Sequence, residues 1–184
     1  AIIDIPWAYK PRHESNTASE SERNAVSQFM TPKKAATEVK KKGYNSSYAA
    51  CYYPWVKVSA PVSGLPTWCP PSVVALGAMS YSEKTQAVWF APAGFTRGGL
   101  SEGRGGLPVL AVSQRLSSKE RDTLYEANIN PIAQFPAEGI VIFGQKTLQA
   151  TPSALDRINV RRLLIFIKKR ISYIAAQLLF DPNV

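Results

Sequence analysis

The last third of the chain carries the strongest repeating pattern in the sequence. Large apolar residues recur there at spacings of 4, 3, 4, 3 and 4, namely Val160, Leu164, Ile167, Ile171, Ile174 and Leu178. This spacing places them along one side of an α-helix, which turns once in about 3.6 residues. Thr151 suits the capping position and Pro152 the first helical position. The sequence therefore predicts a long amphipathic helix from about Pro152 to about Phe180.

The stretch GIVIFGQKT at residues 139–147 is similar at first sight to a phosphate-binding loop. Such a loop needs a lysine directly after its second glycine, so that lysine and backbone amides reach the phosphates together. Here Gln145 separates Gly144 from Lys146, and residues 140–143 between the glycines are large and apolar. Those residues suit a strand that is buried on both faces. We therefore predict a core strand ending in a turn, and no nucleotide site.

Composition limits the class of protein. The chain has 184 residues, 45% of them hydrophobic and 19% charged, which is typical of globular material. Its net charge of +9 suits nucleic acid, a membrane surface or an acidic protein, without choosing among them. No apolar run is long enough to cross a membrane, and the start AIIDIPW does not follow the pattern of a signal peptide.

Side chains that carry out chemistry are sparse. Cys51 and Cys69 lie 18 residues apart and His13 is the single histidine, so we predict two reduced thiols and no metal site. The sequence offers no pairing of a nucleophile or carboxylate with a base, so we expect no catalytic group and no cofactor. Asp4 ends an apolar run, where it either contributes to a ligand site or caps the following turn.

Local signals predict the remaining elements. Thr31, Pro32 and Gly43 mark a lysine-rich helix over residues 31–42, and Ser117 with Glu120 forms a capping box for a helix over residues 116–130. The other expected elements are a strand at 1–4, a polar loop at 11–24, a strand over 47–58 broken at Pro54, an irregular excursion over 59–72, a helix of small residues over 72–84, a strand or extended segment over 87–95, and a flexible glycine-rich surface loop over 96–108.

Several motifs follow one another in a distinctive order. They are CYYPWVKV at 51–58, the double proline before Ser72, WFAPAG at 89–94, LYEANIN at 124–130, GIVIFGQKT at 139–147 and INVRRL at 158–163. As an ordered set they resemble the tail sheath proteins of contractile-tailed bacteriophages. The opening AIIDIP is similar to a strand end of that family, and WFAPAG and INVRR are especially similar to the T-even type of phage.

The resemblance implies an α/β fold in which a mixed β-sheet is flanked by helices. Residues 1–46 would be the start of a conserved sheath core and residues 47–184 its α/β body, with the outer variable domains and a C-terminal segment outside this sequence. It implies a structural subunit that stacks in helical rings around an inner tail tube. Contraction of those rings would drive the tube through the host cell envelope, without nucleotide hydrolysis or a cofactor. R-type pyocins share this architecture.

The implied partners are neighbouring sheath subunits, the inner tail tube protein, and baseplate and tail terminator proteins. Membrane insertion and nucleic-acid binding are not expected, and the subunit would belong to the virion after assembly in the host cytoplasm. In that family basic groups of the sheath face an acidic tube, and the matching candidates are Arg157, Arg161, Arg162, Lys168, Lys169 and Arg170. The alternative is a solvated polar face, with Arg157 or Arg161 in salt bridges inside the chain.

Two other functions stay open at the level of sequence. A basic nucleic-acid-binding structural module is favoured by the +9 charge and by KKGY at 41–44 and INVRR at 158–162. Such a module would bring its basic residues together with exposed aromatic side chains. An α/β enzyme that uses Asp4 and the glycine-rich loop is the third hypothesis.

Overall fold

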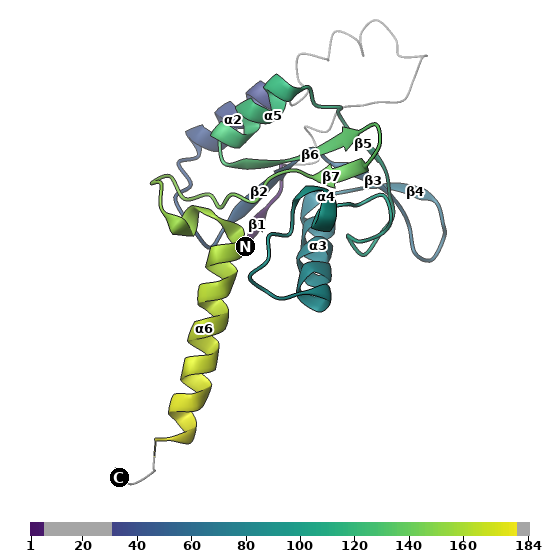
Figure 1. Cartoon of the computed structure of the whole chain (residues 1–184). Coiled ribbons are helices and arrows are strands. Elements are labelled where there is room, and N and C mark those ends of the chain that lie inside the picture. The colour runs from purple at the N-terminus through teal and green to yellow at the C-terminus, as the bar shows by residue number, and fades with distance from the viewer. Residues whose placement is uncertain (6–30, 180–184) are drawn as a thin grey trace, which may run out of the picture.

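The computed structural model describes residues 1–5 and 31–179; the expected polar loop at 11–24, with His13, lies outside these ranges. At its centre is a four-stranded sheet in the order β1-β2-β6-β7 (Figure 1). Pairing is parallel between β1 and β2 and between β2 and β6, and antiparallel between β6 and β7. The sheet is therefore mixed, as the resemblance implies. Its strands are Ile2–Ile3, Ala50–Tyr53, Ile129–Phe135 and Gly139–Ile142, in chain order.

Strand β2 shows that both faces of this sheet are covered. Ala50 and Tyr52 belong to one cluster of buried residues, whereas Cys51 and Tyr53 belong to another. Because successive residues of a strand point to opposite faces, a strand with four buried residues needs a layer on each side. Helices α2 and α5 supply one layer and α3 supplies the other (Figure 1). These helices are Pro32–Lys41, Ser118–Glu126 and Pro71–Thr85, respectively.

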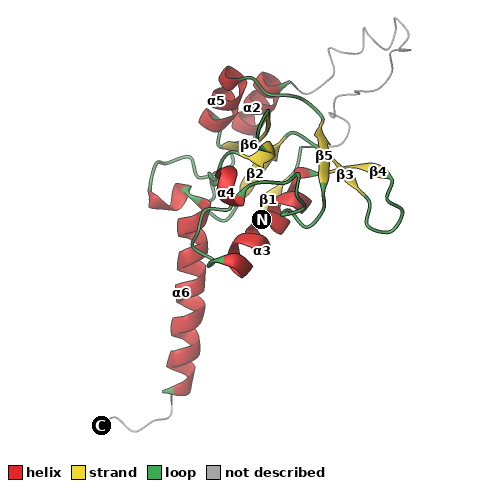
Figure 2. Ribbon diagram, turned by 45° about the vertical axis from the view of Figure 1, so that its right-hand side comes forward, coloured by secondary structure: helices red, strands yellow, loops and turns green. Residues whose placement is uncertain are grey.

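The chain leaves the first sheet through a cis peptide bond between Tyr53 and Pro54, so the break expected there is confirmed. It then forms β3 (Val56–Ser59), the middle strand of an antiparallel sheet in the order β4-β3-β5 (Figure 2). The outer strands are β4 (Pro66–Cys69) and β5 (Val109–Val112). The expectation of an irregular excursion over 59–72 is therefore wrong for β4. Pairing with β3 makes this segment extended, and its own proline-rich composition hides it.

Helices α2 and α5 begin at the predicted caps. The Thr31 hydroxyl accepts a hydrogen bond from the Lys34 amide at 3.2 Å, and Ser117 and Glu120 form both halves of their capping box. Helix α5 ends at Glu126, however, and the expected helix over 116–130 is wrong beyond that point. Asn128 has a φ of 59°, a left-handed conformation that turns the chain into β6.

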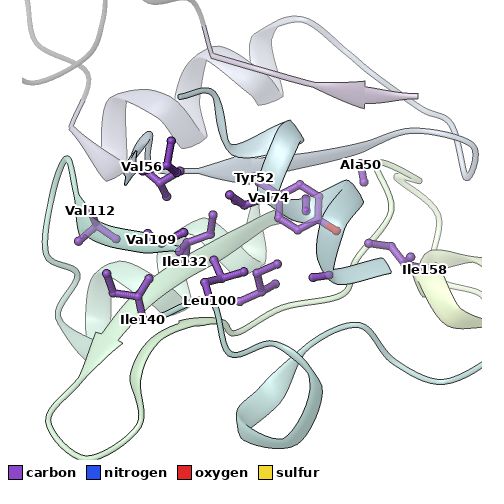
Figure 3. Packing of buried hydrophobic residues seen from close by; sticks show 14 residues of the cluster. Ala50, Tyr52, Val56, Val74, Leu100, Val109, Val112, Ile132, Ile140 and Ile158 are labelled. Carbon is purple, nitrogen blue, oxygen red and sulfur yellow. The ribbon is translucent and has the colours of Figure 1, made fainter. Parts of the chain in front are cut away.

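The glycine-rich segment packs against the body of the domain. Leu100 is fully buried in the cluster beneath α3 (Figure 3), and its amide donates to the Ile140 carbonyl of β7 at 2.8 Å. A Cβ added at Gly77 of α3 would lie 1.8 Å from the Gly105 carbonyl oxygen, so two glycines let α3 and this segment touch. The flexible surface loop expected over 96–108 is therefore wrong.

The segment before it also differs from expectation. No strand occurs over residues 87–95, all of which the structure describes. Turns occupy this stretch, and they lead into the short helix α4 (Gly94–Arg97). The Arg97 side chain donates to the Ala91 carbonyl at 2.8 Å, which holds this compact arrangement in place of a ladder of strand hydrogen bonds.

The long helix α6 spans Ile158–Gln177, so its predicted start at Pro152 is wrong. A short 3₁₀ helix, η3 (Ala154–Asp156), comes first, and Ser153 rather than Thr151 caps it. The turn after β7 holds this junction, since the Ile158 amide donates to the Gln145 carbonyl at 2.8 Å. Among the described residues, no helix is both long and apolar enough to pass through a bilayer.

Candidate interaction surface on helix α6

Helix α6 begins against the body of the domain and then projects away from it (Figures 1 and 2). Its first turns contain the buried residues Ile158 and Arg161. Every residue is exposed from Ile167 to Gln177, where α6 ends, and so are Leu178 and Leu179 directly after it; we call residues 167–179 the free half of α6. The six basic residues predicted as an interface divide between these two parts of the helix.

Arg157, Arg161 and Arg162 fasten the base of the helix to the rest of the chain. Arg157 forms a 3.3 Å salt bridge with Asp156 and also donates to the Tyr125 hydroxyl. These contacts tie Arg157 to the domain. An internal salt bridge of Arg157 was one of the two interpretations of the sequence.

The Arg161 guanidinium donates to the Ser47 hydroxyl and lies 4.1 Å from the centre of the Tyr48 ring. Arg162 forms a 2.8 Å salt bridge with Glu83 of α3. Burial lowers the pKa of Arg162, and the Glu83 carboxylate opposes that shift. These contacts orient α6, and sequence reasoning missed them because Ser47 and Glu83 lie 114 and 79 positions from their partners.

Lys168, Lys169 and Arg170 lie in the free half and are all exposed. The Arg170 guanidinium stacks 5.3 Å from the centre of the Phe166 ring. Three adjacent cations on a projecting helix are accessible to a large partner. Contact of these three residues with an acidic protein stays a prediction.

The free half also exposes large apolar side chains. Ile171 is 60% exposed, Ile174 53% and Leu178 59%, and all three belong to the apolar seam that the sequence predicted. A monomeric soluble domain seldom leaves a contiguous apolar stripe of this kind uncovered, because burial of such side chains releases free energy. Residues 167–179 therefore combine exposed apolar side chains with three exposed cations.

The other candidate positions have structural roles. The Asp4 carboxylate accepts a 3.0 Å hydrogen bond from the Ser72 amide in the first turn of α3, which makes it a helix cap. Residues 139–142 form strand β7, as predicted for GIVIFGQKT, but Phe143 lies beyond the strand and is 40% exposed, so the predicted burial is wrong for that residue. In the turn that follows, Lys146 donates to the Tyr125 carbonyl at 3.0 Å and Thr147 to the Leu155 carbonyl at 3.0 Å, so both side chains join this turn to other segments of the chain.

The thiols are free, as predicted, with Cys51 buried and Cys69 partly exposed. Burial raises the pKa of the Cys51 thiol to about 12, and the nearby Asp4 carboxylate adds to the shift. Across residues 1–5 and 31–179, no cluster of three or more histidine, cysteine or acidic side chains is arranged to hold a metal ion.

Comparison with known proteins shows what the chain is similar to. No family model matches the chain. The tail sheath protein of Vibrio phage KVP40 is 40% identical over 116 residues, which are 63% of this chain. The tail sheath protein of Enterobacteria phage T4 is 33% identical over 116 residues, again 63% of this chain. The matched segment is homologous to tail sheath proteins. This chain spans only 16% and 17% of the lengths of those two relatives.

Solved sheath structures share the fold. The contracted helical sheath of the anti-feeding prophage matches with a TM-score of 0.60 and 27% identity, over 90% of this chain and 46% of that chain. The contracted PVC sheath complex of an extracellular contractile injection system matches with a TM-score of 0.66 and 24% identity, over 91% and 48%. The mixed sheet, the antiparallel sheet and the flanking helices of this chain therefore match the fold of contractile sheaths, and the resemblance drawn from the motifs is confirmed.

Proposed function

We propose that the chain is part of a structural subunit of a contractile phage tail sheath. The subunit polymerises as helical rings around an inner tail tube, and contraction drives that tube through the host cell envelope. The 40% identity to the tail sheath protein of Vibrio phage KVP40 carries this proposal. The long projecting helix supports it, because an exposed apolar and basic surface is suited to assembly rather than to an isolated domain.

The proposal includes the partners of such a subunit. They are neighbouring sheath subunits, the inner tube protein, and the baseplate and tail terminator proteins, with neither membrane insertion nor nucleic acid. Lys168, Lys169 and Arg170 are the exposed candidates for contact with an acidic tube or with a neighbouring subunit. Arg157, Arg161 and Arg162 would support that contact by fixing the direction of the helix. The subunit would be assembled in the host cytoplasm and would remain in the virion.

In this proposal residues 1–46 begin the sheath core and residues 47–184 form its α/β body. The chain acts without enzymatic activity and without a cofactor. Support comes from the side chains with chemical potential, because Asp4, Lys146 and Thr147 all make structural hydrogen bonds. The work of contraction would come from conformational energy stored in the contacts between subunits.

A nucleic-acid-binding module is the alternative function. Its basic residues would follow one track with exposed aromatic side chains beside it. Here the exposed lysines of α2 lie on one side of the body, and the cations of the free half of α6 lie on the helix that projects from the other side (Figure 1). This separation favours two protein contacts over one continuous nucleic-acid track.

Expression of the protein at its full natural length, followed by negative-stain electron microscopy, tests the proposal. A sheath subunit is expected to form long hollow tubes with a helical surface lattice. A reconstruction would show whether Lys168, Lys169 and Arg170 line the lumen. Dispersed monomers over a range of salt and protein concentrations, together with salt-sensitive retention on DNA, would instead support the nucleic-acid-binding module.

A further inference from the structure

A groove is lined by residues of α3 and of the first turns of α6. Its volume of about 490 Å³ lies within the usual range for small-molecule sites. Arg161 and Arg162 line it, and so do Ser47 and Tyr48 from the segment before β2. Most of the remaining wall is apolar and consists of Ile2, Ala50, Leu76, Met79, Ile158 and Ile165. The groove therefore joins an apolar wall to two guanidinium groups.

The two arginines differ in their counter-charges. Arg162 forms its 2.8 Å salt bridge with Glu83. Arg161 is only 9% exposed, and no carboxylate in residues 1–5 or 31–179 forms an ion pair with it. Its guanidinium instead donates to the Ser47 hydroxyl and lies against the Tyr48 ring, which are both uncharged. Arg161 is therefore a buried cation without a matching anion in the part of the chain that the structure describes.

A buried cation of this kind is costly to the fold. Removal of a charge from water is offset well only by an opposite charge, and an aromatic ring or a neutral hydroxyl offsets a smaller part. The Nε–H of Arg161 also donates no hydrogen bond to any described residue. Buried donors in folded proteins are seldom left without an acceptor. Both observations point to a missing anionic acceptor at Arg161.

The charge and the wall of the groove select the class of this anion. One uncompensated cation matches one negative charge, which favours a carboxylate over a phosphate dianion. A carboxylate also fits the guanidinium, because its two oxygens accept hydrogen bonds from the planar fork of N–H groups. A bare ion would leave the apolar wall uncovered, whereas an attached hydrocarbon body gains free energy by covering it.

We propose that this groove binds a carboxylate with an apolar body, and that Arg161 is the cation that holds it. The carboxylate would come from a free organic acid or from an aspartate or glutamate of the sheath subunit outside this sequence. The second source has room, since this chain spans only 16% and 17% of two relatives. An occupied groove would join α3 to the base of α6. This inference goes beyond the proposed function and does not require that tubes form.

The first test titrates the isotope-labelled chain with isocaproate, a small carboxylate with a branched apolar body. Nuclear magnetic resonance follows the Nε–H signal of Arg161, which is assigned by its loss in the Arg161→Lys variant. Isocaproate is expected to shift this signal saturably and to bind at least about tenfold more tightly than its uncharged amide, isocaproamide. Added salt should narrow this difference.

A control addresses the amino group of Ala1, which also lines the groove. This group donates to the Tyr48 carbonyl at 2.6 Å and carries a positive charge of its own. A chain acetylated at Ala1 should bind isocaproate as the unmodified chain does. Loss of binding on acetylation would assign the carboxylate to Ala1 and would overturn the role of Arg161.

A second test places a carboxylate in the groove by substitution. Leu76 of α3 lines the groove and is 57% exposed, so a longer polar side chain is tolerated there. We expect Leu76→Glu to unfold at a temperature about 2–4 °C higher than the neutral Leu76→Gln, and to bind isocaproate at least about tenfold more weakly than the unaltered chain. Ser80→Glu and Ser80→Gln are the matched pair, since Ser80 is exposed on the same helix outside the groove. Their unfolding temperatures should agree within about 1 °C.

The protein at its full natural length distinguishes the two sources of the carboxylate. If a free acid is the ligand, this protein binds isocaproate in calorimetry, and Leu76→Glu is again more stable than Leu76→Gln. If the subunit supplies its own carboxylate, isocaproate does not bind and the order of stability reverses, because the new glutamate meets a like charge.

Other results would overturn the proposal. One is that isocaproate leaves the Arg161 signal of the chain unchanged. Another is that isocaproamide binds equally well, because the groove would then take any apolar molecule. A third is that the glutamate and glutamine variants at Leu76 differ no more than the pair at Ser80. The last is a full-length protein that does not bind isocaproate and in which Leu76→Glu is still the more stable variant, because the rest of the subunit would then cover the groove without a carboxylate.

Discussion

Asn130 joins three segments of the chain through one side chain. It is fully buried, and its amide nitrogen donates to the Cys51 carbonyl at 3.1 Å and to the Lys146 carbonyl at 2.8 Å. Its amide oxygen accepts from the Lys146 backbone N–H at 2.6 Å. A short side chain that both donates twice and accepts is an amide, so asparagine is required here by hydrogen bonding rather than by volume.

The variant Asn130→Asp should therefore destabilise the protein strongly. It keeps the shape but places a second oxygen against two carbonyl oxygens in a fully buried site. We expect the free energy of unfolding to fall by about 3 kcal/mol or more. Asn159→Asp is the control, since Asn159 reaches the Trp89 carbonyl at 3.4 Å and is partly exposed. Urea unfolding measures both, and equal losses in the two variants would contradict the bridging role.

The two cysteines should differ in reactivity toward a thiol reagent. Burial raises the pKa of Cys51 to about 12, so at pH 8 only about one Cys51 in ten thousand is a thiolate. Cys69 is partly exposed, and burial raises its pKa as well. In the folded chain we expect slow labelling of Cys69 and none of Cys51, until denaturant exposes both. Fast labelling of Cys51 in the Cys69→Ala variant under native conditions would show that β2 opens readily.

At the scale of elements, prediction succeeded where the signal lies within a few residues. Thr31 and the pair Ser117 and Glu120 mark the starts of α2 and α5 because a cap is a local contact. Prediction failed for β4 and for the glycine-rich segment, because a paired strand and a packed helix from elsewhere in the chain decide their conformations. The start of α6 was misplaced for the same reason: backbone groups after β7 hold the junction.

The candidate surface on α6 also has a part that could be predicted from the sequence and a part that could not. The seam and the cations Lys168 and Arg170 could be read from spacing alone, since a helix fixes the angle between its residues. The engagement of Arg161 and Arg162 could not, because Tyr48 and Glu83 reach them only through the fold. A basic residue on a predicted helix is therefore a poor guide to an interface until its intramolecular contacts are known.

Because α3 touches the glycine-rich segment, we expect a glycine-to-alanine substitution in α3 to destabilise the protein rather than stabilise it. Glycine to alanine inside an exposed helix normally stabilises it by about 1 kcal/mol. In Gly77→Ala the new methyl group would meet the Gly105 backbone at 1.8 Å, so we expect a loss of about 2 kcal/mol. Gly99→Ala is the control, because its methyl group would only touch the Arg104 side chain at 3.8 Å. Thermal unfolding compares them, and a stabilised Gly77→Ala would show that the two segments separate easily.

At the scale of the whole molecule, the buried core and the exposed apolar residues of α6 lie in different parts of the chain. The body has two buried clusters, one on each face of the four-stranded sheet. The free half of α6 has exposed apolar residues that pack on neither cluster. In the proposed sheath subunit, contacts made by α6 would be able to rearrange without disturbing this core.

This separation predicts that the seam contributes little to the stability of the isolated chain. Replacing both Ile171 and Ile174 by serine should change the free energy of unfolding by less than about 0.5 kcal/mol, because these side chains are already in water. Replacing the fully buried Ile132 by alanine should cost about 3 kcal/mol, since it leaves a cavity between strand and helix. Tryptophan fluorescence during urea unfolding measures both variants.

The same pair of variants in the full-length protein should then separate folding from assembly. The double serine variant is expected to be folded and to form no tubes in negative stain, because the seam is lost while the core is intact. The Ile132→Ala protein, where it remains folded, is expected to form tubes at lower temperature, because its seam is unchanged. If the serine variant instead unfolds, the seam must be buried within the subunit, and its exposure in the isolated domain would mark a contact made by the rest of the same chain.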